Sequence, residues 1–156
     1  MNGAARIERR AVPRGPIPIM EEHVHARGHE NVSGTHGSTL EVTSDDWLTP
    51  AGDCILAVEA DTTPADFDDD FVATCRSPAA TITATLRASG HEQVVEGRGH
   101  PELTLDGDRS MVARTSTYVD DRTVMVDADA AAADLDRELV AALADGADLE
   151  VVFRVE

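Results

Sequence analysis

Seven polar residues between positions 29 and 53 are of the types that bind ligands or transfer protons. They comprise two imidazoles, an amide, two hydroxyls and two carboxylates: His29, Asn31, Thr35, His36, Thr39, Glu41 and Asp53. The second half of the chain contributes His100, which is followed by Pro101, Glu102 and Leu103, without a counterpart of His36. This asymmetry predicts one ligand-binding site built from the seven residues, with His100 added from the other half. The same residue types also cap turns and bond loop backbone, and that interpretation stays open.

An acid–base pair is one chemistry that this cluster can support. A carboxylate that orients an imidazole makes a base near neutral pH, so His36 or His29 could work with Asp53. We therefore take His36 and Asp53 as the candidate catalytic residues. Asp53 also has a structural interpretation, in which Gly52 permits a sharp turn into the next strand and the aspartate bonds the turn backbone.

Metal binding is a second possibility for the histidines. His23 and His25 share one face of an expected strand, and His29 and His36 bracket the loop that follows. Convergence of these imidazoles with Glu41 or Asp53 would form a zinc or iron site. Imidazole-rich strands also occur without metal, and the chain carries no HExxH motif.

The two cysteines, Cys54 and Cys75, have no metal-binding spacing. The apolar neighbours Ile55 and Leu56 predict that Cys54 is buried with a raised thiol pKa. We therefore expect two buried free thiols rather than a disulfide, a metal pair or a nucleophile.

The elements that must position these residues follow the same order in both halves of the chain. Strand patterns in the first half cover 23–27, 38–43, 54–60 and 79–88, with a polar loop at 28–37 and a helix at about 64–76. The second half repeats this order with strands at 93–97, 110–118, 123–128 and 149–155 and a helix at about 130–144.

Residues 58–73 also return in similar form at 126–141, and Arg27-Gly28-His29 aligns with Arg98-Gly99-His100. These matches predict one domain, 21–156, made of two copies of a unit, about 21–89 and 91–156, with pseudo-twofold symmetry. The expected fold is mostly β (α+β): two β-β-β-α-β units that form a compact closed or partly open barrel with two helices. An open sheet packed by two helices is the alternative. Asp61 and Asp129, at matched positions, are expected to bond amides at the helix starts.

The net charge of the chain indicates a salt-rich environment and disfavours nucleic acid as a partner. Thirty acidic residues oppose thirteen basic residues, all arginine, for a net charge of -17. Such acidity is typical of cytosolic proteins of salt-loving archaea, where salt screens the repulsion between carboxylates. It disfavours nucleic acid as a partner, as does the scarcity of aromatic rings. No apolar run reaches the ~20 residues that span a bilayer, so we expect a cytoplasmic protein without membrane contact.

The first nineteen residues differ from the rest of the chain. They carry four arginines and three prolines but lack the apolar stretch of a secretory signal. We expect 1–19 to be a disordered extension, and Met20 to be the initiator if the start site is mis-assigned.

Four segments of the chain resemble a known archaeal family. The segments are Met20-Glu21-Glu22-His23, Arg27-Gly28-His29-x-Asn31-Val32, Thr35-His36-x-x-Thr39-x-Glu41 and Leu48-Thr49-x-x-Gly52-Asp53-Cys54. Together they are similar to the family known as domain of unknown function 371, over essentially residues 20–156. Members tend to begin at the position of Met20, and they often carry a basic residue where this chain has Gly37. The resemblance implies no particular activity.

The function expected from the sequence is a binding module for a small molecule or a protein partner through loops 28–41 and 98–109. A small acid–base hydrolase or isomerase using the region of His36 and Asp53 is the alternative, and an adaptor protein without a pocket is the third. No cofactor is indicated by the sequence, and both a monomer and a homodimer are compatible with it.

Overall fold

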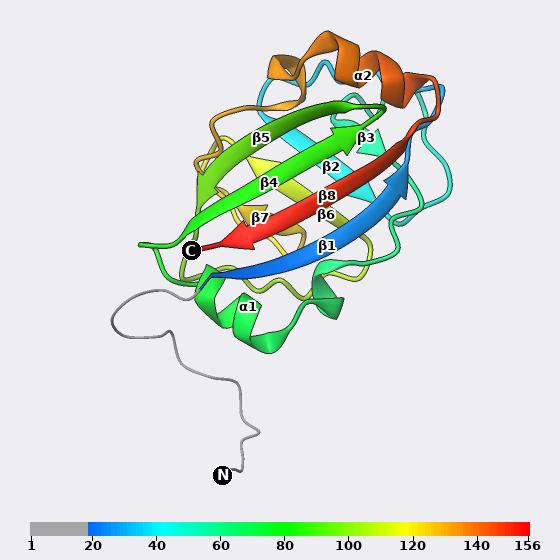
Figure 1. The fold of residues 1–156 in the computed structure, drawn as a ribbon. Helices are drawn as coiled ribbons and strands as arrows, with labels where there is room; N and C mark the ends of the chain where they lie inside the picture. The colour runs from blue at the N-terminus through cyan, green and yellow to red at the C-terminus, as the bar shows by residue number, and fades with distance from the viewer. Residues whose placement is uncertain (1–18) are drawn as a thin grey trace.

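Two four-stranded sheets face each other in the computed structural model, which describes residues 19–156. Sheet A has the order β1 (Met20–Arg27), β8 (Asp148–Val155), β4 (Thr81–Ala88) and β5 (His91–Arg98). Sheet B has the order β3 (Ile55–Ala57), β2 (Thr39–Thr43), β6 (Ser110–Arg114) and β7 (Thr123–Met125). Sheet A lies in front of sheet B in Figure 1, with α1 (Asp69–Cys75) and α2 (Arg137–Ala144) at opposite ends. The expected extension at 1–19 lies, apart from Ile19, outside the described residues.

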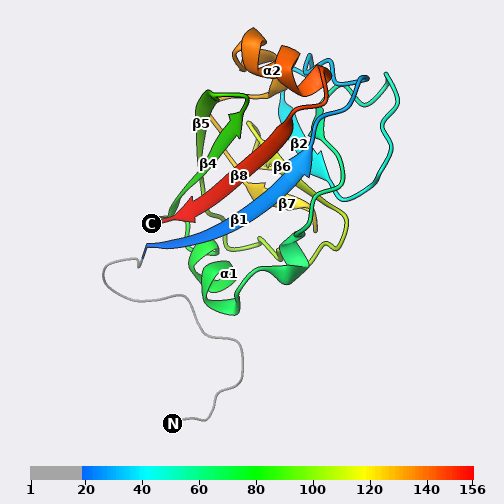
Figure 2. The same ribbon diagram turned by 45° about the vertical axis from the view of Figure 1, so that its right-hand side comes forward.

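The mostly β fold with two helices is confirmed, but a closed barrel is not found. Strand hydrogen bonding among residues 19–156 stays within two separate sheets. Isolated bridges, Arg27 with Val58 and Arg98 with Val126, connect the sheets at two corners. Figure 2 shows the two layers and the short strands of sheet B behind sheet A. Strands β3 and β7, with three residues each, are too short to continue the pairing around a closed wall.

Alternation along the strands builds the core between the sheets. Val24 and Ala26 of β1 and Leu40 and Val42 of β2 are buried in one apolar cluster, whereas the residues between them point to the outer faces. A strand turns successive side chains to opposite faces, so each sheet keeps an outer face that is separate from the core. The outer faces are therefore where polar side chains can gather.

Both sheets have a symmetric strand order. Strands β1 to β4 of the first half correspond to β5 to β8 of the second half. When each strand is replaced by its counterpart, each sheet shows the same strand order read from the opposite edge. The bridge between Arg27 and Val58 likewise has its counterpart in the bridge between Arg98 and Val126. The two halves of the described chain therefore occupy equivalent places in both sheets.

Each predicted helix is shorter than expected because it splits into two pieces. A 3-10 turn, Pro64–Asp66 or Ala132–Asp134, precedes each α-helix, and Phe67 and Leu135 between the pieces have extended backbone. Both side chains are buried in the core, so burying them interrupts the helix. No helix within residues 19–156 is long and apolar enough to cross a membrane.

Asp61 and Asp129 bond strand amides rather than helix amides, contrary to our expectation. The Asp61 carboxylate accepts a hydrogen bond from the His25 amide at 3.0 Å, and the Asp61 amide donates to the His25 carbonyl at 2.9 Å. Asp129 makes the same pair of bonds with Glu96, at 3.0 and 2.8 Å. The two aspartates thus satisfy backbone groups on β1 and β5, the edge strands of sheet A.

Candidate functional site

The loop that carries most of the predicted site residues packs against α2. The His29 amide donates to the Leu143 carbonyl at 3.0 Å, and Arg137 donates to the Gly34 carbonyl at 3.1 Å. The Asn31 side chain donates to the Leu48 carbonyl at 2.8 Å, and its amide donates to Nδ1 of His29 at 3.0 Å. Asn31 and His29 therefore hold loop backbone in place.

His36 and Asp53 are neighbours, but their contact is through the backbone. The amides of Thr35 and His36 donate to the Asp53 carbonyl at 3.0 and 3.2 Å. Nδ1 of His36 lies 3.2 Å from the amides of Ser38 and Thr39 and 3.1 Å from the Thr39 hydroxyl. Because these backbone amides donate to Nδ1, the ring proton sits on Nε2 in this arrangement. No hydrogen bond joins the His36 ring to the Asp53 carboxylate, both of which belong to the described part of the chain.

His100 lies far from the other predicted site residues. Its amide donates to the Cys75 carbonyl at the end of α1, as the His29 amide does to Leu143 of α2. Since the helices lie at opposite ends of the molecule (Figure 1), loops 28–41 and 98–109 are not brought together. The expectation of one site shared by these two loops is therefore not met by the geometry.

The four histidines proposed as metal ligands do not converge either. His23 and His25 point outward on β1, where His25 lies 3.8 Å from Asp61 and 3.7 Å from Glu150. His29 and His36 belong to the loop on α2. Within residues 19–156, the one close group of possible metal ligands is His91, Asp136 and Glu138, which the sequence did not indicate. Asp136 and Glu138 are exposed and His91 is half-buried, and Asp136 already accepts from the Glu138 amide at the start of α2.

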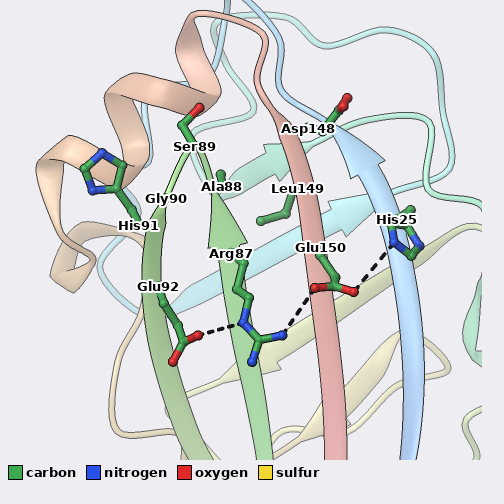
Figure 3. A pocket seen from close by; sticks show the side chains of 10 residues that line it. All are labelled: His25, Arg87, Ala88, Ser89, Gly90, His91, Glu92, Asp148, Leu149 and Glu150. Carbon is green, nitrogen blue, oxygen red and sulfur yellow. Dashed lines mark hydrogen bonds and ion pairs between the residues drawn. The ribbon is translucent and has the colours of Figure 1, made fainter.

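An ion-pair ladder crosses the outer face of sheet A. Figure 3 shows Glu92, Arg87, Glu150 and His25 on four successive strands beside an open depression of about 310 Å³. Arg87 contacts Glu92 at 2.6 Å and Glu150 at 3.3 Å. Each charge already has a partner on the neighbouring strand, so the ladder acts as cross-strand pairing.

The outer face of sheet B carries a more buried set of charges, here called the outer network: Glu41, Cys54, Arg114, Asp120 and Arg122. Glu41 lies opposite Val112 in the β2–β6 pair and Thr39 lies opposite Arg114, so side chains from the two halves meet on this face. The Glu41 carboxylate lies 3.4 Å from Sγ of Cys54 and 3.8 Å from Arg122. Arg114 and Arg122 both donate to the Asp120 carboxylate, at 3.0 and 3.1 Å.

The pKa values in the outer network follow from these contacts. Burial by itself raises the pKa of Asp120, but hydrogen bonds from Arg122, Thr123 and Arg114 outweigh burial and hold the pKa at about 2. Burial, followed by the charge of Glu41, raises the pKa of the Cys54 thiol to about 11. Burial also raises the pKa of Cys75, and both cysteines are free thiols. Cys54 is therefore protonated near neutral pH, and its raised pKa agrees with the sequence prediction, although the side chain is half-buried rather than buried.

Two exposed aromatic side chains lie beside the outer network. Trp47 and Tyr118 are each the fourth residue after their strands, β2 and β6. Their side chains are 55% and 61% exposed. The Arg109 guanidinium lies 6.0 Å from the Trp47 ring, and the Arg114 guanidinium lies 4.9 Å from the Tyr118 ring. We call the area formed by Trp47, Tyr118, Arg109 and the outer network the sheet B surface.

The sheet B surface brings aromatic rings and guanidinium groups together on one face. It offers aromatic faces for stacking and guanidinium groups for hydrogen bonding. Glu41 of the predicted site belongs to it and Thr39 lies opposite Arg114 on the same face, but sequence reasoning missed the arginines and the two rings. The matching positions of Trp47 and Tyr118 after β2 and β6, together with the alternation that places Arg114 on the face of Val112, were the available signals.

Comparison with known proteins gives the relationship of the chain. Residues 24–156 match the family model described as "Domain of unknown function (DUF371)". The chain is also similar to "Uncharacterized protein MJ0206" of Methanocaldococcus jannaschii, with 39% identity over 136 residues, which is 87% of this chain and 98% of that protein. The match covers nearly the whole described structure, including the sheet B surface. The chain therefore belongs to the domain of unknown function 371 family.

Proposed function

We propose that this protein is a binding module whose ligand docks on the sheet B surface. The observation that carries the proposal is the pair of exposed rings, Trp47 and Tyr118, each with an arginine against it. Exposed tryptophan and tyrosine beside arginine are the residues that most often dominate binding energy in recognition surfaces. Trp47 follows β2 and Tyr118 follows β6, and these antiparallel strands have five residues each. The segments that carry the two rings therefore begin about 14 Å apart along the strand direction, at ~3.4 Å per residue, which suits a ligand of nucleotide or dipeptide length.

Three observations favour this surface over the loop pair 28–41 and 98–109 as the binding site. The two loops lie at opposite ends of the molecule, and their histidines accept hydrogen bonds from backbone amides. The sheet B surface, in contrast, joins residues of both halves at the centre of the β2–β6 pair. Of the residues expected from the sequence, Thr39 and Glu41 lie on this face, where they meet arginines of the second half.

The intrinsic fluorescence of Trp47 tests the proposal, because Trp47 is the one tryptophan of the chain. Binding of small aromatic compounds should quench or shift its emission, and Tyr118→Ala should weaken that binding at least fivefold. Val94→Ala is the matched control, since Val94 is a large exposed side chain on the outer face of sheet A, 49% exposed. Unchanged emission across a chemically broad compound panel, or equal binding by Tyr118→Ala, would contradict the proposal.

The alternatives from the sequence make different predictions. A hydrolase or isomerase that uses His36 and Asp53 would lose activity in His36→Asn, whereas a binding module on the sheet B surface would keep its ligand affinity in that variant. An adaptor without a pocket would bind a protein through the same rings but no small compound. Titration of the protein with small compounds, followed by Trp47 fluorescence, separates the adaptor from the small-molecule binding module.

We also propose that the strong acidity serves solubility in a salt-rich cytoplasm and that the two halves arose by duplication. The net charge of -17 supports the first statement, and the symmetric strand orders support the second. Neither proposal bears on the identity of the ligand.

A further inference from the structure

Two arginines of the sheet B surface, Arg109 and Arg122, lie further outward than the carboxylates that pair with them, whereas Arg114 is 11% exposed beside Asp120 at 23%. The Arg109 side chain is 61% exposed, whereas its partner Asp45 is 23% exposed. The Arg122 side chain is 42% exposed, whereas Asp120 and Glu41 beside it are 23% and 12% exposed. A ligand that approaches this surface therefore meets cationic groups first.

Exposed ion pairs elsewhere in the described structure show this arrangement at most in part, since Arg87, 50% exposed, is paired with Glu150 at 33% but also with Glu92 at 54%. Arg27 and its partner Glu59 are 52% and 43% exposed, and Arg154 and Glu21 are 41% and 43% exposed. At these sites the carboxylate reaches solvent about as far as the arginine does. The inversion of exposure at Arg109 and Arg122 is thus not a general property of the long arginine side chain.

Both outward arginines keep donor capacity for a ligand. Nε and Nη2 of Arg109 donate to one Asp45 oxygen, at 2.9 and 2.7 Å, and no hydrogen bond from Nη1 is found within residues 19–156. Nε and Nη2 of Arg122 donate to Asp120, whereas its Nη1 is 3.8 Å from Glu41, beyond hydrogen-bond distance. The half-buried carboxylates of Asp45 and Asp120 hold the guanidinium planes in place, and the remaining N–H groups point away from those bonds.

We infer that the ligand of the sheet B surface is a planar aromatic compound that carries an anionic group, phosphate or carboxylate. This inference rests on the proposed function. The ring would stack on Trp47 or Tyr118, and the anion would accept hydrogen bonds from Arg109 and Arg122, as phosphate and carboxylate groups commonly do from guanidinium. The rest of the surface is strongly acidic and repels anions, so binding is confined to the place where the cations are outermost.

Calorimetric titration with two matched pairs of probes tests the inference. Adenosine 5′-monophosphate is compared with adenosine, and benzoate is compared with benzamide, so that phosphate and carboxylate are examined separately. At least one anionic probe should bind about tenfold more tightly than its neutral partner, and the difference should shrink as salt rises. Which pair shows the difference identifies the anionic group.

The matched variants are Arg109→Gln and Arg27→Gln, since each arginine is exposed and pairs with one carboxylate, Asp45 or Glu59. Arg109→Gln should remove most of the preference for the anionic probe, and Arg27→Gln should leave it unchanged. Equal binding of anionic and neutral probes, with Trp47 emission still responding, would overturn this inference and leave the proposed function standing. If no compound changes Trp47 emission and no probe binds, both fail together.

Discussion

Replacing Asp120 with asparagine should destabilise the protein, because the Asp120 carboxylate ties two strands and a loop together. It accepts hydrogen bonds from Arg114, Arg122 and the Thr123 hydroxyl. Its pKa of about 2 instead of 3.8 corresponds to about 2.4 kcal/mol, at ~1.36 kcal/mol per pH unit. Solvent screening reduces this figure, so we expect a loss of about 1–2 kcal/mol in the free energy of unfolding at pH 7.

The pH dependence gives the prediction its sign. The folded-state pKa of Asp120 is lower than the ordinary value, so its stabilisation is fully present above about pH 5 and is lost as pH falls through about 2. Urea unfolding of wild type and Asp120→Asn should therefore differ most near pH 7 and converge toward pH 2. The comparison is made at constant ionic strength because the chain is so acidic.

Asp121→Asn is the control, since Asp121 is the exposed neighbour and its backbone carbonyl, which remains in the variant, accepts from Gly107. The Asp121→Asn variant should lose less than about 0.5 kcal/mol in the free energy of unfolding, as is usual for substitutions at exposed positions. Equal destabilisation by Asp120→Asn and Asp121→Asn, or a difference that persists unchanged at pH 2, would refute the reasoning.

Other substitutions and conditions test separate parts of the structure. Gly28→Ala should cost about 3 kcal/mol or more in chemical unfolding, because a Cβ there would lie 2.0 Å from a carbonyl oxygen of α2, whereas Gly37→Ala, with open space around it, should be nearly neutral. Asp61→Ala should lower the free energy of unfolding by about 1 kcal/mol through the lost bond to a β1 amide, and a thermal melt unaffected by this change would argue against edge protection. The melting temperature should rise between about 0.1 and 2 M potassium chloride if carboxylate repulsion limits stability at low salt. Cys54, with its pKa of about 11, should react with iodoacetamide far more slowly at pH 7.5 than an ordinary exposed thiol, and fast modification in the folded protein would contradict its described environment.

The strand alternation and the repeated glycines in the sequence predicted features that depend only on local backbone geometry. His23 and His25 share one face of β1, as the strand pattern predicts, and Val24 and Ala26 between and after them are buried. The matched glycines, Gly28 and Gly99, have a clear physical basis, because a Cβ on either would collide with backbone carbonyls at the end of α2 or α1. The repeated Arg-Gly-His segments are thus explained by close approach of two chain segments.

The predicted helices were too long because periodicity does not reveal where a core residue must leave the helix. Phe67 takes an extended backbone conformation and is buried against Phe71 and Phe153. A closed barrel is not found, because strand pairing beyond sequence neighbours depends on strand length and register, which the sequence pattern specifies weakly.

The amino-acid sequence by itself determined the order of elements, the inward-facing residues, the acidity and the similarity of the two halves, because these depend on local spacing and composition. Only the tertiary structure decided which polar residues meet. His36 and Asp53 proved to be joined through backbone, whereas Glu41 and Arg122, far apart in the chain, lie on one face because β2 pairs with β6. Such long-range pairing places side chains according to strand register, and no local pattern of residue types contains that register.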